Sequence, residues 1–149
     1  MNNIYSIFLN SVVEGYVLNK DYIKDLEIAV SYDSLKSFNS NFRTYSMDLG
    51  RRLGATTAIK QYIDNHQELT LVYISSMIMW DHVFGAEKLK NVSFCNSTDS
   101  LGGKFSNTDI FLFDNYTLLT KNKIFKDLDD MILDNMNTHC LNQIYVRFQ

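Results

Sequence analysis

The strongest constraint on the fold of this chain is the stretch from Leu69 to Trp80, which is apolar nearly all round at helical spacing. A helix of that kind has no polar face for solvent, so most of its sides are buried. The helix predicted around it runs from about Glu68 to Lys90. Its second half is amphipathic, and Gly85 interrupts it. The sequence therefore predicts a helix that other elements surround.

Other segments also carry apolar residues at helical spacing. We expect helices over residues 4–18, 42–63 and 124–136, because apolar residues recur there every three or four positions. A short helical pattern with Tyr22, Leu26 and Ala29 on one face follows the first of them. Two polar segments separate the predicted helices: residues 31–41 indicate a loop or a frayed helix, and residues 91–107 indicate a loop.

Two glycines, Gly50 and Gly54, fall inside the helix predicted over residues 42–63. Each costs a helix about 1 kcal/mol relative to alanine. Their spacing of four puts them on one face, where close approach of another backbone would compensate. A phosphate-binding loop is the alternative. We reject it at this point because the glycines are predicted mid-helix and the Lys-Ser/Thr ending of a P-loop is missing.

Strand signals are confined to the C-terminal part of the chain. Residues 109–113 and 116–120 flank Asp114-Asn115 and predict a β-hairpin. Residues 144–148 alternate apolar and polar positions, which predicts a half-buried strand. The expected fold class is α+β, mostly helical, with about four helices packed on a small antiparallel sheet formed by the hairpin and the C-terminal strand. We expect one domain, covering residues 1–149.

Composition narrows the functional classes. Hydrophobic residues make up 46% of the chain, which is enough for a core, and the net charge of −3 comes without a basic stripe, so nucleic-acid binding is not expected. No segment has the pattern of a transmembrane helix, a signal peptide or a lipid anchor. Cys95 and Cys140 form no metal-ligand pattern, and we expect reduced thiols in a cytoplasmic protein.

No catalytic constellation is visible in the sequence. His66 is expected to be solvated near a helix end, and His82 has no nucleophile at helical spacing. His139 and Cys140 are neighbours in sequence, whereas thiol enzymes bring such residues together in space. Four aspartates of the segment 124–136 lack the EF-hand glycine and glutamate and indicate a solvated helix face or a patch for a basic partner; they are Asp127, Asp129, Asp130 and Asp134. We therefore predict a non-enzymatic chain with no catalytic, cofactor or metal residues.

Three segments in order resemble subunits of the TRAPP vesicle-tethering complex, the subunit 5-like branch most and the subunit 6-like branch next. They are Leu-Gly-Arg-Arg-Leu-Gly-Ala at 49–55, Met-Trp-Asp-His-Val-Phe-Gly-Ala-Glu-Lys-Leu at 79–89, and Asp-Ile-Phe-Leu-Phe-Asp-Asn-Tyr-Thr-Leu-Leu at 109–119. The resemblance covers residues 45–120, and the C-terminal part is shorter than in that family. The family-motif and core positions it implies are Leu49, Gly50, Leu53, Gly54, Trp80, Phe84, Gly85, Leu89, Phe111, Phe113, Leu118 and Leu119.

The resemblance implies a scaffold role in ER-to-Golgi transport. Such a subunit pairs with other TRAPP-like subunits, supports nucleotide exchange on a Rab GTPase only indirectly, and meets ER and cis-Golgi membranes only through the complex. Two alternatives remain open. One is a small-ligand-binding domain of the related sensor fold, which requires a closed cavity among its helices. The other is a helical interaction modulator, which requires a groove for a partner helix.

Overall fold

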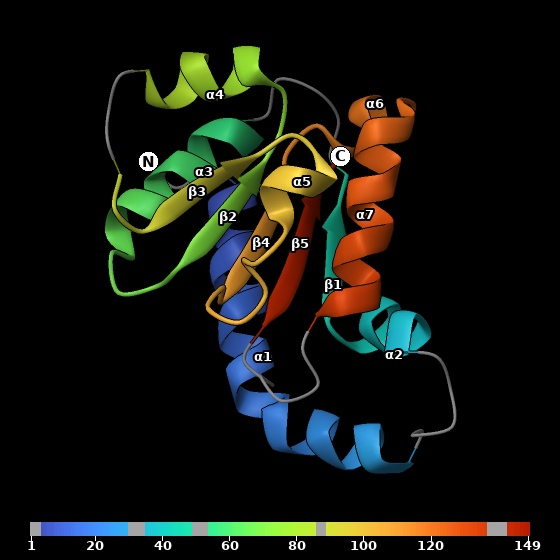
Figure 1. The fold of residues 1–149 in the computed structure, drawn as a ribbon. Coiled ribbons are helices and arrows are strands. Elements are labelled where there is room, and N and C mark those ends of the chain that lie inside the picture. The colour runs from blue at the N-terminus through green and yellow to red at the C-terminus, as the bar shows by residue number, and fades with distance from the viewer. Residues whose placement is uncertain (1–3, 30–34, 49–53, 86–88, 137–142) are drawn as a thin grey trace.

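The protein is described by a computed structural model over residues 4–29, 35–48, 54–85, 89–136 and 143–149. Its centre is a five-stranded sheet in which every neighbouring pair of strands runs parallel (Figure 1). In order across the sheet, the strands are β1 (Thr44–Met47), β5 (Ile144–Phe148), β4 (Ile110–Phe113), β2 (Leu71–Ile74) and β3 (Val92–Cys95).

Strand β4, in the middle of the sheet, and its neighbour β2 are buried at all four positions. A strand of a parallel sheet is covered on both faces and therefore consists of a continuous apolar run rather than an alternating one. Leu-Val-Tyr-Ile and Ile-Phe-Leu-Phe are such runs. They stand side by side in register, with Tyr73 opposite Leu112.

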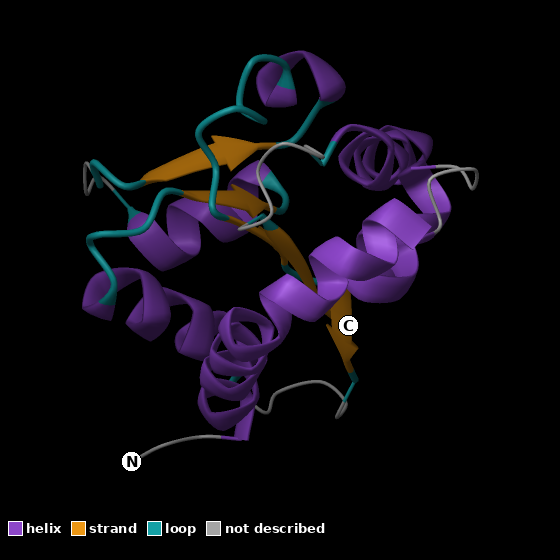
Figure 2. Cartoon of the chain, turned by 90° about the horizontal axis from the view of Figure 1, so that it is seen from below, coloured by secondary structure: helices purple, strands orange, loops and turns teal. Residues whose placement is uncertain are grey.

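Helices cover both faces of the sheet (Figure 2). Side chains of α1, α3 and α4 pack on one face, against residues such as Tyr73 and Leu112. Side chains of α5, α6 and α7 pack on the other, against residues such as Val72 and Phe111. The helices are α1 (Ile4–Ala29), α2 (Leu35–Phe42), α3 (Ala55–Asn65), α4 (Met77–Phe84), α5 (Thr98–Leu101), α6 (Tyr116–Leu119) and α7 (Lys123–Asn135).

The predicted antiparallel sheet is wrong. Residues 110–113 form β4, which pairs in parallel with β2 and β5, and residues 116–119 form helix α6 instead of a second hairpin strand. Asn115 lies between them in the left-handed region, with φ 55°, and begins α6. The hairpin interpretation failed because a central parallel strand and a hairpin strand share the same short apolar run, and only the partner strands distinguish them.

Two of the predicted long helices are also wrong. Within residues 42–63, the structure has strand β1 and, after a connection, helix α3. Within residues 68–90, it has strand β2 and helix α4, separated at Ser75 and Ser76. Ser76 caps α4 by accepting a hydrogen bond from the Met79 N–H over 3.3 Å. The segment predicted as a loop over 91–107 contains strand β3 and helix α5.

Other predictions are confirmed. Helix α7 and strand β5 coincide closely with the segments predicted over 124–136 and 144–148. The prediction that this strand is half-buried is wrong, because β5 has covered residues on both faces of the sheet. The first predicted helix lies within α1, which continues through Ala29, and the frayed-helix alternative for 31–41 matches α2.

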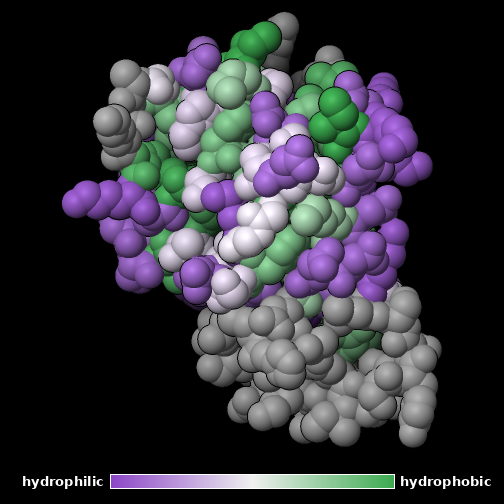
Figure 3. Space-filling model, viewed as in Figure 1, coloured by the Kyte–Doolittle hydropathy of each residue, from purple (hydrophilic) through white to green (hydrophobic). Residues whose placement is uncertain are grey.

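The surface carries hydrophilic side chains along the outer side of α7 (Figure 3). Exposed Lys123 pairs there with Asp127, and Lys36 of α2 pairs with Asp130. None of the helices in the described ranges is long and apolar enough to cross a membrane.

Candidate functional site

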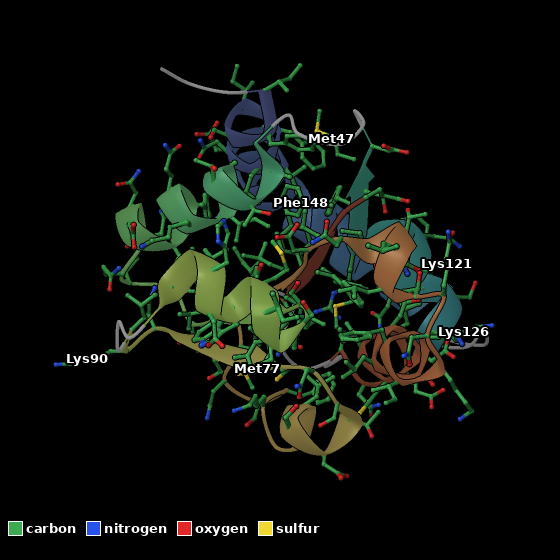
Figure 4. The ribbon with its side chains drawn as sticks, turned by 90° about the horizontal axis from the view of Figure 1, so that it is seen from above. Met47, Met77, Lys90, Lys121, Lys126 and Phe148 are labelled. Carbon is green, nitrogen blue, oxygen red and sulfur yellow. The ribbon has the colours of Figure 1, made fainter. Side chains whose placement is uncertain are left out.

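The edge of the sheet at which the strands end contains a point where the chain changes direction. After β2 the chain enters α4 on one face, and after β4 it enters α6 and α7 on the opposite face. In open sheets of this kind, ligands bind in the crevice outside the carboxyl ends of two such strands. Figure 4 views this edge from above, with Met47 and Phe148 marking the ends of β1 and β5 and Met77 the start of α4. The residues that follow β2 and β4 are therefore the first candidates for a site.

Asp114, the residue directly after β4, is the centre of a hydrogen-bond cluster at this edge. Its Oδ2 accepts hydrogen bonds from the Thr56 hydroxyl over 2.6 Å and from the Tyr73 hydroxyl over 2.8 Å. Its Oδ1 accepts one from the backbone N–H of Asn115 over 3.0 Å. Three elements thus meet at one carboxylate: the first turn of α3, strand β2 and the end of β4.

The carboxylate is almost completely enclosed, since Asp114 is 2% exposed. Burial raises the pKa of this carboxyl above its ordinary value, and the hydrogen bonds from Thr56, Tyr73 and Asn115 act in the opposite direction. The pKa of Tyr73 is raised as well, first by burial and then by the adjacent Asp114 charge. An enclosed carboxylate with a raised pKa is frequent at functional sites.

Helix α3 begins directly beside this cluster. Gly54 precedes it at φ 87°, in the left-handed conformation that glycine adopts without strain, and no side chain caps this end of α3 among the described residues. The N–H groups of a helix's first turn lack intrahelical partners and carry the positive end of the dipole, which favours an anion. Thr56, in that turn, joins the helix start to Asp114.

Ser75, the residue directly after β2, adds a further hydroxyl to this edge. It is 0% exposed, and its Oγ has no hydrogen-bond partner in the part of the chain that the structure describes. It lies close enough to the Tyr73 hydroxyl to lower the pKa of that phenol, although without hydrogen-bond geometry.

A second buried polar cluster, formed by Asp129, Arg147, Tyr116 and Tyr145, lies on the opposite face of the sheet. Asp129 accepts hydrogen bonds from Tyr116, Tyr145 and Arg147 over 2.9, 2.7 and 2.7 Å, respectively. The guanidinium of Arg147 also stacks 4.5 Å from the ring centre of Tyr116. The positive charge of Arg147 balances the negative charge of Asp129. The hydrogen bonds of this cluster link α6 and α7 to β5. The prediction that Asp129 belongs to a solvated acidic face is therefore wrong.

The residues singled out by the family resemblance lie on several separate elements of the structure. Gly54 begins α3, and Gly85 ends α4 at φ 56°. Leu118 is 53% exposed, while Phe111 and Phe113 are fully buried. Trp80, Leu89 and Leu119 are partly buried, Phe84 is buried, and Leu49, Gly50 and Leu53 lie outside the described residues. The predicted close packing of Gly50 and Gly54 within one helix is wrong for Gly54, which lies outside the helix.

The histidines and the cysteine in the described ranges, His66, His82 and Cys95, do not form a site. His66 stacks on Tyr62 and pairs with Glu68 over 3.0 Å, and His82 is exposed in the last turn of α4. Buried Cys95 donates its S–H to the Ser100 carbonyl over 3.3 Å. His139 and Cys140 lie outside the described residues.

Metal binding has one candidate location. Within the described ranges, no group of three His, Cys, Asp or Glu residues could hold an ion. Mg²⁺, however, is usually held by one or two carboxylates together with waters and substrate phosphates rather than by a protein cage. The oxygens of Thr56 and Asp114 suit that mode of binding. The sequence reasoning missed both residues, although an apolar run ending in Asp and a Gly-x-Thr helix start were visible signals.

Comparison with known proteins adds nothing to this geometry: the chain matches no family model, no curated protein and no solved structure. The resemblance to TRAPP subunits therefore has no support from relatives and stays a prediction.

Proposed function

We propose that this chain binds the phosphate groups of a nucleotide, together with Mg²⁺, at the start of α3. The observation that carries the proposal is the 2.6 Å hydrogen bond from Thr56 to Asp114. In P-loop proteins a glycine-containing loop leads from a strand into a helix, a Ser/Thr hydroxyl in the first turn contacts Mg²⁺, and an Asp after a buried strand completes its coordination.

The order of elements supports the same arrangement. Strand β1 leads to Gly54 and helix α3, and Thr56 stands two residues after that glycine, where a P-loop has its Ser/Thr. Asp114 follows four buried residues of β4. The sequence argued against a phosphate-binding loop partly because Gly54 was predicted in the middle of a helix. That reason no longer applies, because Gly54 lies directly before α3.

Two positions depart from the P-loop pattern. The first glycine of that pattern falls at position 49, where this chain has Leu49. A P-loop has a lysine before the Ser/Thr, which reaches the terminal phosphates, whereas this chain has Ala55. Lys60, one turn further along α3, pairs with Asp64 over 3.0 Å and does not take its place. The residues present therefore fit the metal and the helix-dipole part of such a site but lack the cationic part, and we expect weak binding.

The proposal concerns binding and not turnover. When bound, Mg²⁺ would neutralise phosphate charge. The chain's own groups orient the ion and the phosphates: Thr56 and Asp114 through oxygen atoms, and the first turn of α3 through its N–H groups. Asn115, which follows Asp114, is an amide and cannot accept a proton as a general base.

Thermal stability provides the test. A ligand that binds only the folded state at 100 times its dissociation constant stabilises it by about 2.7 kcal/mol. Mg·ATP, Mg·GTP or Mg·tripolyphosphate should raise the melting temperature of the wild type, and chelation with EDTA should abolish the increase. Thr56→Val should show a clearly smaller increase, while Thr57→Val, which changes an exposed neighbour on the same helix, should retain it in full.

A melting temperature that none of the three polyphosphates raises would contradict the proposal. So would an increase of equal size in Thr56→Val and Thr57→Val.

The scaffold role implied by the TRAPP resemblance has a separate test. Affinity purification from the source cell should recover TRAPP subunits if that role holds, and recovery of none would exclude it. Its third motif was interpreted as a hairpin and forms β4 and α6 instead, so the geometry supports phosphate binding better.

A further inference from the structure

Ser75 has a buried hydroxyl that the described residues leave without a hydrogen-bond partner. Its side chain is 0% exposed, and its Oγ has no partner among the described residues. Buried polar groups in native proteins are almost always hydrogen-bonded, because an unpaired one retains the full penalty of losing water. An exception of this kind requires an explanation.

The position of Ser75 places its hydroxyl beside the Asp114 cluster. Ser75 directly follows β2, two residues after Tyr73, and it lies close enough to the Tyr73 hydroxyl to influence the pKa of that phenol. The Tyr73 hydroxyl donates to Asp114 over 2.8 Å. The ends of β2 and β4 lie next to each other, since the Asp114 N–H donates a hydrogen bond to the Ile74 carbonyl over 3.0 Å. Ser75 and Asp114 are thus the first residues beyond adjacent strand ends.

Other buried atoms without partners lie elsewhere. Tyr62 is in the second half of α3, one turn before His66 and away from Thr56, and lines a small cavity of about 70 Å³ with Ser6 and Asn10. Asn91 donates its amide to the His66 carbonyl and lies at that same end of α3. Within the described part of the chain, Ser75 is the residue that combines complete burial, an unused hydroxyl and a location at the proposed site.

We propose that the Ser75 hydroxyl is a binding group of this site, donating to an oxygen of the ligand, either a phosphate oxygen or a water bound to Mg²⁺. This inference rests on the proposed function and extends it to the end of β2. On binding, the hydroxyl then gains a hydrogen bond that the described residues do not supply. A hydrogen bond to a charged acceptor is stronger than one between neutral groups, so Ser75 favours an anionic ligand.

The test compares Ser75→Ala with Ser76→Ala by calorimetric titration of Mg·ATP and Mg·tripolyphosphate. Ser75→Ala should weaken binding about tenfold. Its melting temperature without ligand should equal or exceed that of the wild type, because it removes an unpaired buried hydroxyl. Ser76→Ala removes the cap of α4, so it should melt at a lower temperature and bind as the wild type does. Ser75→Cys, nearly the same in size but a poor donor, should bind as weakly as Ser75→Ala.

The outcomes separate this inference from the proposed function. If the wild type binds neither ligand, the proposed function fails and this inference fails with it. If Thr56→Val weakens binding while Ser75→Ala and Ser75→Cys bind as the wild type does, only the role of Ser75 is overturned. A clearly lower melting temperature of unliganded Ser75→Ala would also overturn it, because the hydroxyl would then already stabilise the fold.

Discussion

The Thr56 hydroxyl donates a hydrogen bond to the Asp114 carboxylate over 2.6 Å, joining two residues that are 58 positions apart in the chain. One belongs to the first turn of α3 and the other directly follows β4. The contact brings a helix N-terminus and a buried carboxylate to the same edge of a parallel sheet, which is the arrangement that phosphate and Mg²⁺ favour.

Ala55→Lys tests the proposed site by adding the group it lacks. A lysine at this position would donate a charge-assisted hydrogen bond to phosphate, worth about 1.5–3 kcal/mol, or roughly tenfold to a hundredfold in affinity. Titration calorimetry with Mg·ATP should show that increase. Thr57→Lys adds the same charge at the exposed next-but-one position and should change affinity less than threefold, as an approximate limit for nonspecific attraction. Equal gains in affinity for Mg·ATP in both variants would show that the added charge attracts the nucleotide nonspecifically and not at the proposed site.

The raised pKa of Asp114 predicts how its stability contribution depends on pH. Folding raises this pKa, so the folded protein binds the proton more tightly than the unfolded chain does. The free energy of unfolding of the wild type should therefore increase relative to Asp114→Asn as the pH falls from 7 toward the raised pKa. Urea unfolding of both proteins at pH 7 and pH 5 measures the difference. A wild type that loses stability relative to the variant over this interval would indicate a lowered pKa.

The buried pair of Arg147 and Asp129 is expected to contribute far more to stability than the exposed pair of Lys36 and Asp130. The first has side chains 15% and 11% exposed, the second 45% and 41%. Arg147→Met leaves a buried carboxylate without its cation and should cost about 3–5 kcal/mol. Lys36→Met should cost at most about 0.5 kcal/mol. Denaturant midpoints provide the comparison, and similar costs for both variants would show that Asp129 is not enclosed in solution.

Phe111 and Leu118 distinguish the parallel sheet from the hairpin that the sequence suggests. Phe111 is fully buried in β4, and Leu118 is 53% exposed on α6. Phe111→Ala should cost about 3–5 kcal/mol because it leaves a cavity, whereas Leu118→Ala should cost about 0.5 kcal/mol or less. Comparable losses at the two positions would favour a fold in which both residues face the core.

The sequence predicted elements well where polar and apolar positions recur regularly, even at β5, which is buried on both faces. The periodicity of residues 124–136 and the alternation of residues 144–148 identified α7 and β5. It failed at β2 and β4, because a short apolar run buried on both faces fits a helix, a hairpin strand or a parallel strand equally well. The Ser75-Ser76 pair, of which Ser76 caps α4, was the local signal that separates strand from helix there.

The candidate site could not be predicted from the sequence, for a different reason. Thr56 and Asp114 meet only because β4 is placed in the middle of the sheet, with α3 packed across one face. No local pattern contains that information. The burial of Asp129 was missed similarly, since its cation, Arg147, comes from β5, 18 residues away.

The decisive experiment for nucleotide binding at the start of α3 is calorimetric titration of Mg·ATP into the wild type and Thr56→Val, with Thr57→Val as the matched control. We expect saturable binding of one nucleotide to the wild type and to Thr57→Val, dependent on Mg²⁺, with affinity reduced about tenfold in Thr56→Val. Absence of binding to the wild type, or equal affinity in all three proteins, would contradict it.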